Sequence, residues 1–155
     1  MSIETVRAYF KTCGREGDVL EFPVSSAVEL AAQALGVIPA RIAKTLSFLV
    51  EDRCILILAA GDAKIDNKKY KAQFHTKAKM LLAGQVEPLT GHAVGGVCPF
   101  ANPEGTTAYL DVSLKRFDTV FPAAGSPNSA IELSCAELEA FSHSAGWVDV
   151  CKDWG

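Results

Sequence analysis

The sequence predicts a mixed α/β fold of the α+β kind, and three observations support this. Two strongly apolar segments, 45–50 and 54–60, are separated only by three charged residues, which is the pattern of an antiparallel hairpin in the middle of a sheet. Several further short segments are strand-like, and helical segments of mixed placement accompany them. No internal repeat or low-complexity linker divides the chain, so we expect a single domain.

The segments before the hairpin alternate between helix and strand. Residues 2–13 carry apolar side chains on or near one face at helical spacing, and residues 19–24 have a strand-like composition. Ser26 and Glu29 have the Ser-x-x-Glu spacing of a capping box, which predicts the start of a helix that ends at Gly36. A short turn then leads to the hairpin.

Alternation along the first hairpin strand separates two faces of different character. Lys44, Leu46 and Phe48 lie on one side, whereas Thr45 and Ser47 lie on the other. Lys44 therefore begins the bulkier apolar face, and its positive charge lies at one end of that apolar surface.

The second half of the chain predicts shorter elements. They are, in order, a helix over 67–83, a segment 86–89 that leads through Thr90 to Gly91 as a helix stop, strands at 109–112, 119–121 and 130–133, a helix over 136–143 capped by Ser134, and an edge strand at 147–150. Short strands with helices of mixed placement are typical of an α+β or mixed α/β sheet.

The composition is that of an ordinary globular chain. Hydrophobic residues make up 49% of the 155 residues and charged residues 21%. The net charge of −3 excludes a protein that holds nucleic acid by a broad basic surface, so we expect no DNA partner. No apolar run approaches the ~20 residues of a membrane span, and the first residues lack the layout of a signal peptide, so we expect a cytoplasmic protein without a membrane partner.

The five cysteines are widely spaced and odd in number, which predicts reduced thiols. No Cys-x-x-Cys and no zinc-finger spacing of cysteine and histidine occurs, so we expect no metal and no cofactor. Asp62 and Asp66 could suggest metal ligands, but Gly61 and Asp62 first indicate a hairpin turn.

A glycine loop is the most informative segment. Gly95 and Gly96, followed by Pro99, describe a backbone that approaches something closely, because glycine lacks the Cβ that would block the approach and proline fixes the exit direction. With Lys44, which begins the sequence Lys-Thr-Leu, this loop resembles the YbaK/EbsC family of aminoacyl-tRNA deacylases. These are relatives of the editing domain inserted in bacterial prolyl-tRNA synthetases. The resemblance runs from about residue 21 to about residue 138.

The resemblance implies a single editing domain over 1–155, with a highly twisted, partly barrel-like mixed sheet flanked by helices. It also implies that Lys44 and the loop from Gly95 to Pro99 line the editing pocket. The family function would be hydrolysis of a wrongly charged aminoacyl-tRNA, with a small or medium amino acid on tRNA(Pro) or a related tRNA. A prolyl-tRNA synthetase is a possible further partner.

Ester hydrolysis by such a pocket needs no protein nucleophile. The backbone amides around Gly95, Gly96 and Val97 would bind the oxyanion, and Lys44 would hold a phosphate or the carbonyl, while water or a ribose hydroxyl makes the attack. Apolar groups would border the side chain of the amino acid and reject large ones. The expected substrate-binding residues are Phe22, Leu46, Phe48, Pro99, Phe100, Gly125 and Ser126.

One segment departs from the family pattern. Residues 121–133 resemble a third motif, a glycine-rich turn that enters an Ile-Glu-Leu strand. Ala123 and Ala130 stand where the YbaK branch carries a serine and an aspartate. The departure argues against the cysteinyl-tRNA substrate of that branch and keeps open a non-catalytic module that binds tRNA or a synthetase.

Two further readings concern charge and thiol chemistry. Lys64, Lys68, Lys69 and Lys71 belong to a lysine-rich stretch that is either a solvated helix face or a contact for the acceptor stem of tRNA.

Cys98 with His92 nearby would suit a thiol hydrolase, which is a minor alternative.

Overall fold

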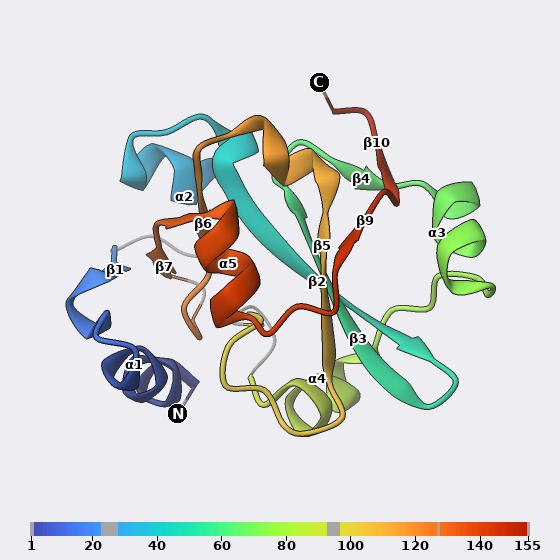
Figure 1. Ribbon diagram of the computed structural model, residues 1–155, viewed down its shortest axis with the longest axis horizontal. Coiled ribbons are helices and arrows are strands. Elements are labelled where there is room, and N and C mark those ends of the chain that lie inside the picture. Colours follow the sequence, from blue (N-terminus) through green and yellow to red (C-terminus); the bar gives the residue numbers. More distant parts are fainter. Residues whose placement is uncertain (1, 23–27, 93–96, 127, 155) are drawn as a thin grey trace.

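A six-stranded mixed sheet forms the centre of the computed structural model, which describes residues 2–22, 28–92, 97–126 and 128–154. The strand order is β8-β6-β2-β3-β5-β9 (Figure 1). The strands of this sheet are β2 (Ile42–Val50), β3 (Arg53–Ala60), β5 (Thr107–Asp111), β6 (Thr119–Pro122), β8 (Leu133–Ser134) and β9 (Trp147–Val148). The predicted hairpin is confirmed, because β2 and β3 pair antiparallel in the middle of the sheet.

The hairpin is closed by a tight turn. Val50 pairs with Arg53, so only Glu51 and Asp52 form the loop, and both have positive φ angles of 49° and 67°. Two central residues with positive φ are the mark of the type I′ turn, whose twist matches that of the flanking strands. The three charged residues of the sequence pattern therefore contribute two turn residues and the first residue of β3.

Helices cover both faces of the sheet. On one face, Tyr70 of α3 (Asn67–Phe74) packs on Phe48 with ring centroids 5.1 Å apart. On the other, Leu89 of α4 (Ala83–Thr90) packs against Leu56 and its neighbours. Strand alternation explains this division, since Phe48 and Leu56 belong to opposite faces of the hairpin.

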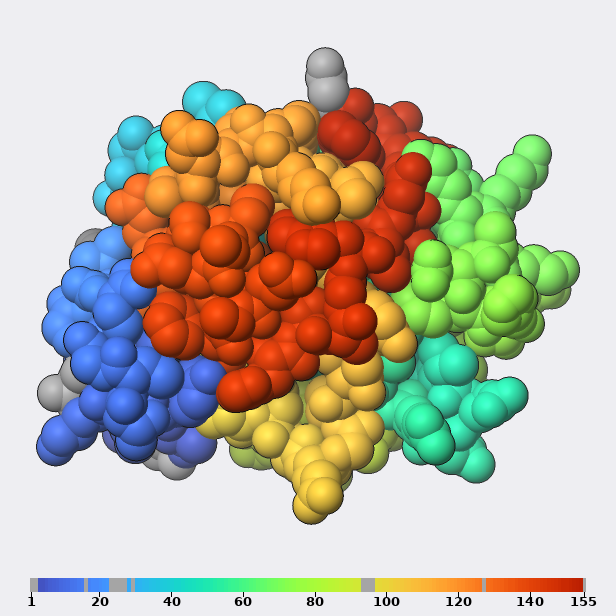
Figure 2. All heavy atoms as spheres, in the orientation of Figure 1, coloured from blue at the N-terminus to red at the C-terminus, as the bar shows by residue number. Residues whose placement is uncertain are grey.

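The N-terminal helix α1 (Ser2–Thr12) packs beside α5 (Cys135–Phe141), with the rings of Phe10 and Phe141 5.6 Å apart (Figure 2). Ser134 caps α5, as the sequence predicts, and the structure shows that it forms a capping box with Glu137. Among the helices of the described segments, none is long and apolar enough to cross a bilayer.

The sheet curls into part of a barrel, which confirms the expected twisted and partly closed architecture. Two small antiparallel pairs extend it: β1 (Val19–Glu21) with β7 (Ser129–Ile131), and β4 (Lys64–Ile65) with β10 (Cys151–Lys152). The remaining elements are α2 (Val28–Leu35) and the 3-10 turns at Glu16–Asp18, Pro39–Arg41 and Val112–Arg116. The expected capping box at Ser26 lies outside the described residues.

The predicted helix over 67–83 is wrong beyond Phe74. His75 adopts a left-handed conformation, φ 62°, which ends α3, and the chain then runs extended to Leu82. Backbone hydrogen bonds along β2 hold this segment: Leu49 N–H donates to the Lys79 carbonyl at 2.8 Å, and Leu81 N–H donates to the Ser47 carbonyl at 3.3 Å. These partners lie some thirty residues away in sequence, so local composition could not predict them.

Two other expectations change in detail. Residues 86–89 lie inside α4, which ends at Gly91 with φ 80° as the predicted stop. The single strand expected at 130–133 is divided between β7 and β8, because these two strands pair with different partners, β1 and β6.

Candidate functional site

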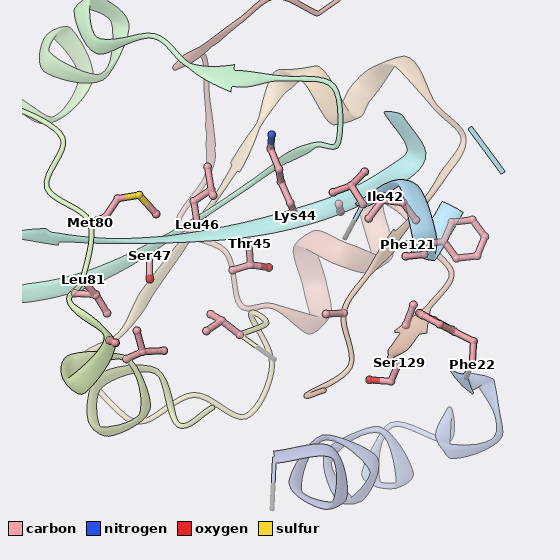
Figure 3. Close-up of a pocket in the computed structure, with 18 residues that line it drawn as sticks. Phe22, Ile42, Lys44, Thr45, Leu46, Ser47, Met80, Leu81, Phe121 and Ser129 are labelled. Atoms are coloured by element: carbon pink, nitrogen blue, oxygen red, sulfur yellow. The ribbon is translucent and has the colours of Figure 1, made fainter. Parts of the chain in front are cut away.

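The strand pairing along the outer edge of β2, the edge away from β3, is interrupted, and a cavity lies at the interruption. β6 pairs with β2 only at Ile42 and Ala43, and the extended segment after α3 takes over the same edge at Ser47. Within the described residues, no strand pairs with this edge between those two points. A cavity of about 470 Å³ opens there (Figure 3).

The wall of the cavity is mostly apolar and comes from segments far apart in sequence. Its lining residues are Phe22, Val28, Ala31, Ile42, Ala43, Lys44, Thr45, Leu46, Ser47, Met80, Leu81, Ala83, Val86, Val97, Phe121, Ala123, Ser129 and Ala130. No histidine, cysteine or carboxylate occurs in this described lining. The cavity therefore offers hydroxyl groups, backbone groups and one lysine to a ligand.

Thr45 is the most unusual polar residue of the lining. Its Oγ1 is buried and has no hydrogen-bond partner among the described residues. A buried hydroxyl without a partner costs about 1–3 kcal/mol relative to a satisfied one. Ser47, 9% exposed, points to the same side of β2 as Thr45, as Figure 3 shows. These two hydroxyl side chains are suited to hydrogen-bond a ligand in the cavity.

The backbone of Thr45 faces the same opening. In a strand, the N–H and C=O groups of alternate residues point to the same edge. Ser47 and Leu49 use theirs to bind the extended segment on the outer edge of β2. The peptide groups of Thr45 therefore point to that edge as well, at the place where the described pairing is interrupted.

Lys44 lies on the other side of the strand. Figure 3 shows its side chain directed away from Thr45 and Ser47, on the side of Leu46, and its Nζ donates a hydrogen bond to the carbonyl of Ala63. The Lys44 charge also acts on Asp62, whose pKa is lowered mainly by its hydrogen bonds to Arg116 and to a smaller extent by Lys44. Lys44 thus contributes to the lining of the cavity, while its ammonium is directed to the Ala63 carbonyl.

The turn before β7 holds the opposite wall in place. Ser126 Oγ donates to Ser129 Oγ at 2.7 Å, and Ser129 lines the cavity. Asn128 Nδ2 donates to the Phe22 carbonyl at 3.1 Å, which joins this turn to β1 and its neighbour Phe22. Gly125 and Ser126 are not lining residues themselves, and Ser126 holds Ser129 in place through this hydrogen bond.

The structure brings together some of the predicted site residues and separates others. Phe22, Leu46 and Val97 line the cavity with Lys44. Gly95 and Gly96 lie outside the described residues, and Val97 is the first described residue after them.

The expectation that Phe48, Pro99 and Phe100 border the pocket needs correction. All three are buried and do not line the cavity. Phe48 packs on Tyr70 on the opposite face of the sheet, and Phe100 packs edge-on against Phe10 at 4.8 Å. Of the bulky face of β2, Lys44 and Leu46 line the cavity and Phe48 does not, and Thr45 and Ser47 of the hydroxyl face line it as well.

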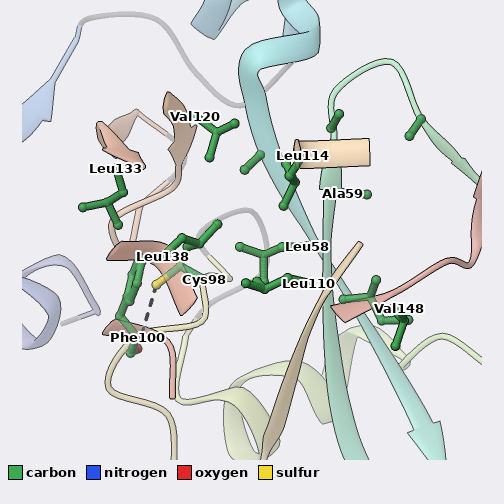
Figure 4. Packing of buried hydrophobic residues seen from close by; sticks show 14 of the residues in the cluster. Leu58, Ala59, Cys98, Phe100, Leu110, Leu114, Val120, Leu133, Leu138 and Val148 are labelled. Carbon is green, nitrogen blue, oxygen red and sulfur yellow. Dashed lines mark hydrogen bonds between the residues drawn. The ribbon is translucent and has the colours of Figure 1, made fainter. Parts of the chain in front are cut away.

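The thiol and imidazole of the loop are structural. Cys98 Sγ lies 3.4 Å from His92 Nε2, which also contacts the Phe100 carbonyl at 2.7 Å. Both side chains are fully buried (Figure 4 shows Cys98 in the core). Burial raises the pKa of Cys98 to about 12 and lowers that of His92, so both groups are held neutral. This neutral, buried pair does not fit the thiol-hydrolase alternative.

Comparison with known proteins places these features in a family. Residues 23–141 match the family model of the aminoacyl-tRNA editing domain. The chain is 59% identical to the uncharacterized protein YwhH of Bacillus subtilis (strain 168), over 99% of both chains.

Two solved structures share the whole fold. The structure of a candidate trans-editing enzyme for prolyl tRNA synthetase matches with a TM-score of 0.88 and 29% identity over 97% of each chain. The structure of the hypothetical protein APE2540 matches with a TM-score of 0.82 and 27% identity, over 96% of this chain and 99% of that one. The chain belongs to the aminoacyl-tRNA editing domain family.

Proposed function

We propose that this protein is an aminoacyl-tRNA deacylase that acts in trans as a single domain over residues 1–155, in the cytoplasm. The observation that carries the proposal is the cavity at the interrupted edge of β2, with the buried Thr45 hydroxyl that lacks a partner in the described structure. Membership of the editing-domain family supports the ester of an aminoacyl-tRNA as the substrate.

The reaction needs position and charge stabilisation more than a nucleophile. Water attacks the ester carbonyl carbon, the bond from that carbon to the ribose oxygen breaks, and the ribose oxygen takes up a proton, relayed by the neighbouring ribose hydroxyl. Thr45 supplies a hydroxyl and a backbone N–H at the open edge, and both are donors of the kind that stabilise an oxyanion. We also assign this role to the amides of Gly95, Gly96 and Val97.

Lys44 supplies the positive charge of the site. Its ammonium donates to the Ala63 carbonyl when no substrate is bound, and from a residue that lines the cavity it would attract a phosphate or the ester carbonyl of the substrate. The carbonyl of Ala63 keeps the charge at one place in the absence of substrate, which limits the reorganisation needed on binding.

The cavity suits a small or medium amino acid. A volume of about 470 Å³ has to hold the ester and part of the terminal nucleotide as well as the side chain. Its wall is rich in apolar groups such as Ile42, Leu81 and Phe121, and Ala123 and Ala130 add no polar group. The likeness to a candidate trans-editing enzyme for prolyl tRNA synthetase supports tRNA(Pro) or a related tRNA as the carrier and the synthetase as a partner.

The test is deacylation of tRNAs charged with alanine, cysteine, serine, threonine and proline, at protein concentrations far below those of the substrate. We expect accelerated loss of one or two of these esters by the wild-type protein. Protection of an ester from spontaneous hydrolysis, with no turnover of any of them, would contradict the proposal and identify a non-catalytic binding module instead.

A further inference from the structure

The positive charge of the protein is concentrated in one short segment. Residues 64–79 contain six lysines and one aspartate, a net charge of +5 in a chain whose total is −3. The remaining residues therefore carry a net charge of −8. Such a concentrated cationic surface on an acidic protein favours one local contact with an anionic partner over general attraction.

The structure divides these lysines by their partners. Lys69 Nζ bonds Asp149 Oδ1 and the Cys151 carbonyl, both at 3.0 Å, so it ties α3 to the C-terminal strand. Lys68, Lys71 and Lys77, by contrast, line one hollow of about 360 Å³ together with Asn67 and Ala78. No acidic residue is part of this described lining.

The lysine hollow, defined as Lys68, Lys71 and Lys77, lies next to the cavity along the chain. Ala78 lines the hollow and Met80 lines the cavity, so the two are two positions apart in sequence, which is at most about 7 Å of extended chain. The segment between is fixed to β2 by the hydrogen bonds of Lys79 and Leu81. The two depressions therefore keep a constant relative position.

The chain that runs from the hollow to the cavity and beyond carries accessible apolar side chains. Met80 is 56% exposed and Leu82 is 70% exposed, the third highest and the highest values among the exposed large hydrophobic side chains of the described residues. Lys79 is exposed beside them. The extended segment 77–82 thus presents two lysines, Lys77 and Lys79, followed by three apolar residues. Lysines can contact the phosphates of a single nucleic-acid strand, and apolar side chains can lie against its exposed base faces.

We infer that the lysine hollow binds backbone phosphates of the RNA strand whose 3′ end enters the cavity, and that this strand runs along residues 77–82. The inference rests on the proposed function, because it takes the aminoacyl end of a tRNA as the occupant of the cavity. From the lysine-rich stretch it selects Lys68, Lys71 and Lys77 as the contact, and it assigns Lys69 to holding the fold. Lys64 lies in β4, paired with β10, and is outside the hollow.

The test compares two triple variants for binding to an uncharged tRNA(Pro) transcript over a range of potassium chloride concentrations. One variant combines Lys68→Gln, Lys71→Gln and Lys77→Gln. The control combines Lys11→Gln, Arg53→Gln and Lys115→Gln, three exposed cations elsewhere, and so removes the same charge. Thermal unfolding of both variants checks that each retains the fold.

Three phosphate contacts predict a clear difference. For the hollow variant, we expect the slope of log Kobs against log salt to fall by about 2, and the affinity at 0.1 M salt to fall about 10- to 100-fold. The control variant should keep the slope of the wild type. In deacylation, the hollow variant should raise KM by a similar factor and leave kcat unchanged, since no lysine of the hollow touches the ester.

The outcomes separate this inference from the proposed function. Equal salt slopes for the wild type and both variants would overturn the inference, even if the wild type hydrolyses an ester. Loss of RNA affinity in the hollow variant alone, with no ester turned over by any protein, would support the RNA surface and contradict the deacylase. Normal RNA binding with weakened binding to prolyl-tRNA synthetase would identify an acidic protein partner and overturn the inference.

Discussion

Replacing Thr45 by valine separates the stability of the fold from the function of the cavity. Valine has nearly the shape of threonine and lacks only the hydroxyl, so the substitution leaves the packing of β2 in place. The Thr45 hydroxyl is buried and finds no partner among the described residues. Its removal should relieve the cost of a buried group without a hydrogen bond, which is about 1–3 kcal/mol.

We therefore expect Thr45→Val to leave the free energy of unfolding unchanged or to raise it, by up to about 2 kcal/mol. The same change should lower kcat/KM for ester hydrolysis by about 10- to 100-fold, which corresponds to about 1.4–2.7 kcal/mol of lost transition-state stabilisation. Opposite effects on stability and activity are typical of a functional group, because a purely structural hydroxyl would stabilise the fold.

Urea unfolding and deacylation of a mischarged tRNA measure the two quantities. Thr106→Val is the matched control, because the Thr106 hydroxyl does have a partner, the Leu89 carbonyl at 2.5 Å. The control should destabilise the protein by about 1 kcal/mol and leave turnover unchanged. A Thr45→Val variant that is destabilised as much as the control, with normal turnover, would refute the reasoning.

Three further predictions concern charge and thiol chemistry. Lys44→Met should lower kcat/KM about 100-fold and leave the fold intact, and unchanged turnover would remove Lys44 from the site. The Asp62 carboxylate, whose pKa is lowered in the folded protein, stabilises the fold at pH values above its unfolded-state pKa, and this contribution is lost as the pH falls through its folded-state pKa. Asp62→Asn should therefore weaken the dependence of the free energy of unfolding on pH in the acid range. An unchanged pH dependence would contradict this prediction. Cys98, buried and with its pKa raised to about 12, should resist iodoacetamide at pH 8 in the native protein, and mass spectrometry showing rapid modification with loss of turnover would revive the thiol mechanism.

Local patterns in the sequence were sufficient for much of the fold. The hairpin of β2 and β3 follows from two apolar runs, and the start of α5 follows from Ser134 as its N-cap, since both depend on neighbouring residues. The extended segment after His75 could not be predicted, because its conformation is fixed by hydrogen bonds to Ser47 and Leu49.

The same limit explains the partial success at the site. Alternation correctly separates Lys44 and Leu46 from Thr45 and Ser47, but it does not tell which residues of the strand border a cavity. That choice depends on where β6 ends along β2 and where another segment replaces it. The hydroxyls of Thr45 and Ser47 were visible in sequence as a small polar pair in an apolar strand, which could have suggested a polar opening there.

Filling the cavity tests the central claim most directly. Ala123 lines the cavity wall, and the volume of about 470 Å³ accommodates a phenylalanine side chain. The measurement is multiple-turnover deacylation of the preferred mischarged tRNA by the wild type and by Ala123→Phe, with thermal unfolding of both. We predict that the variant loses turnover and keeps the unfolding temperature of the wild type. A folded Ala123→Phe variant that hydrolyses the ester at the wild-type rate would show that the reaction takes place elsewhere.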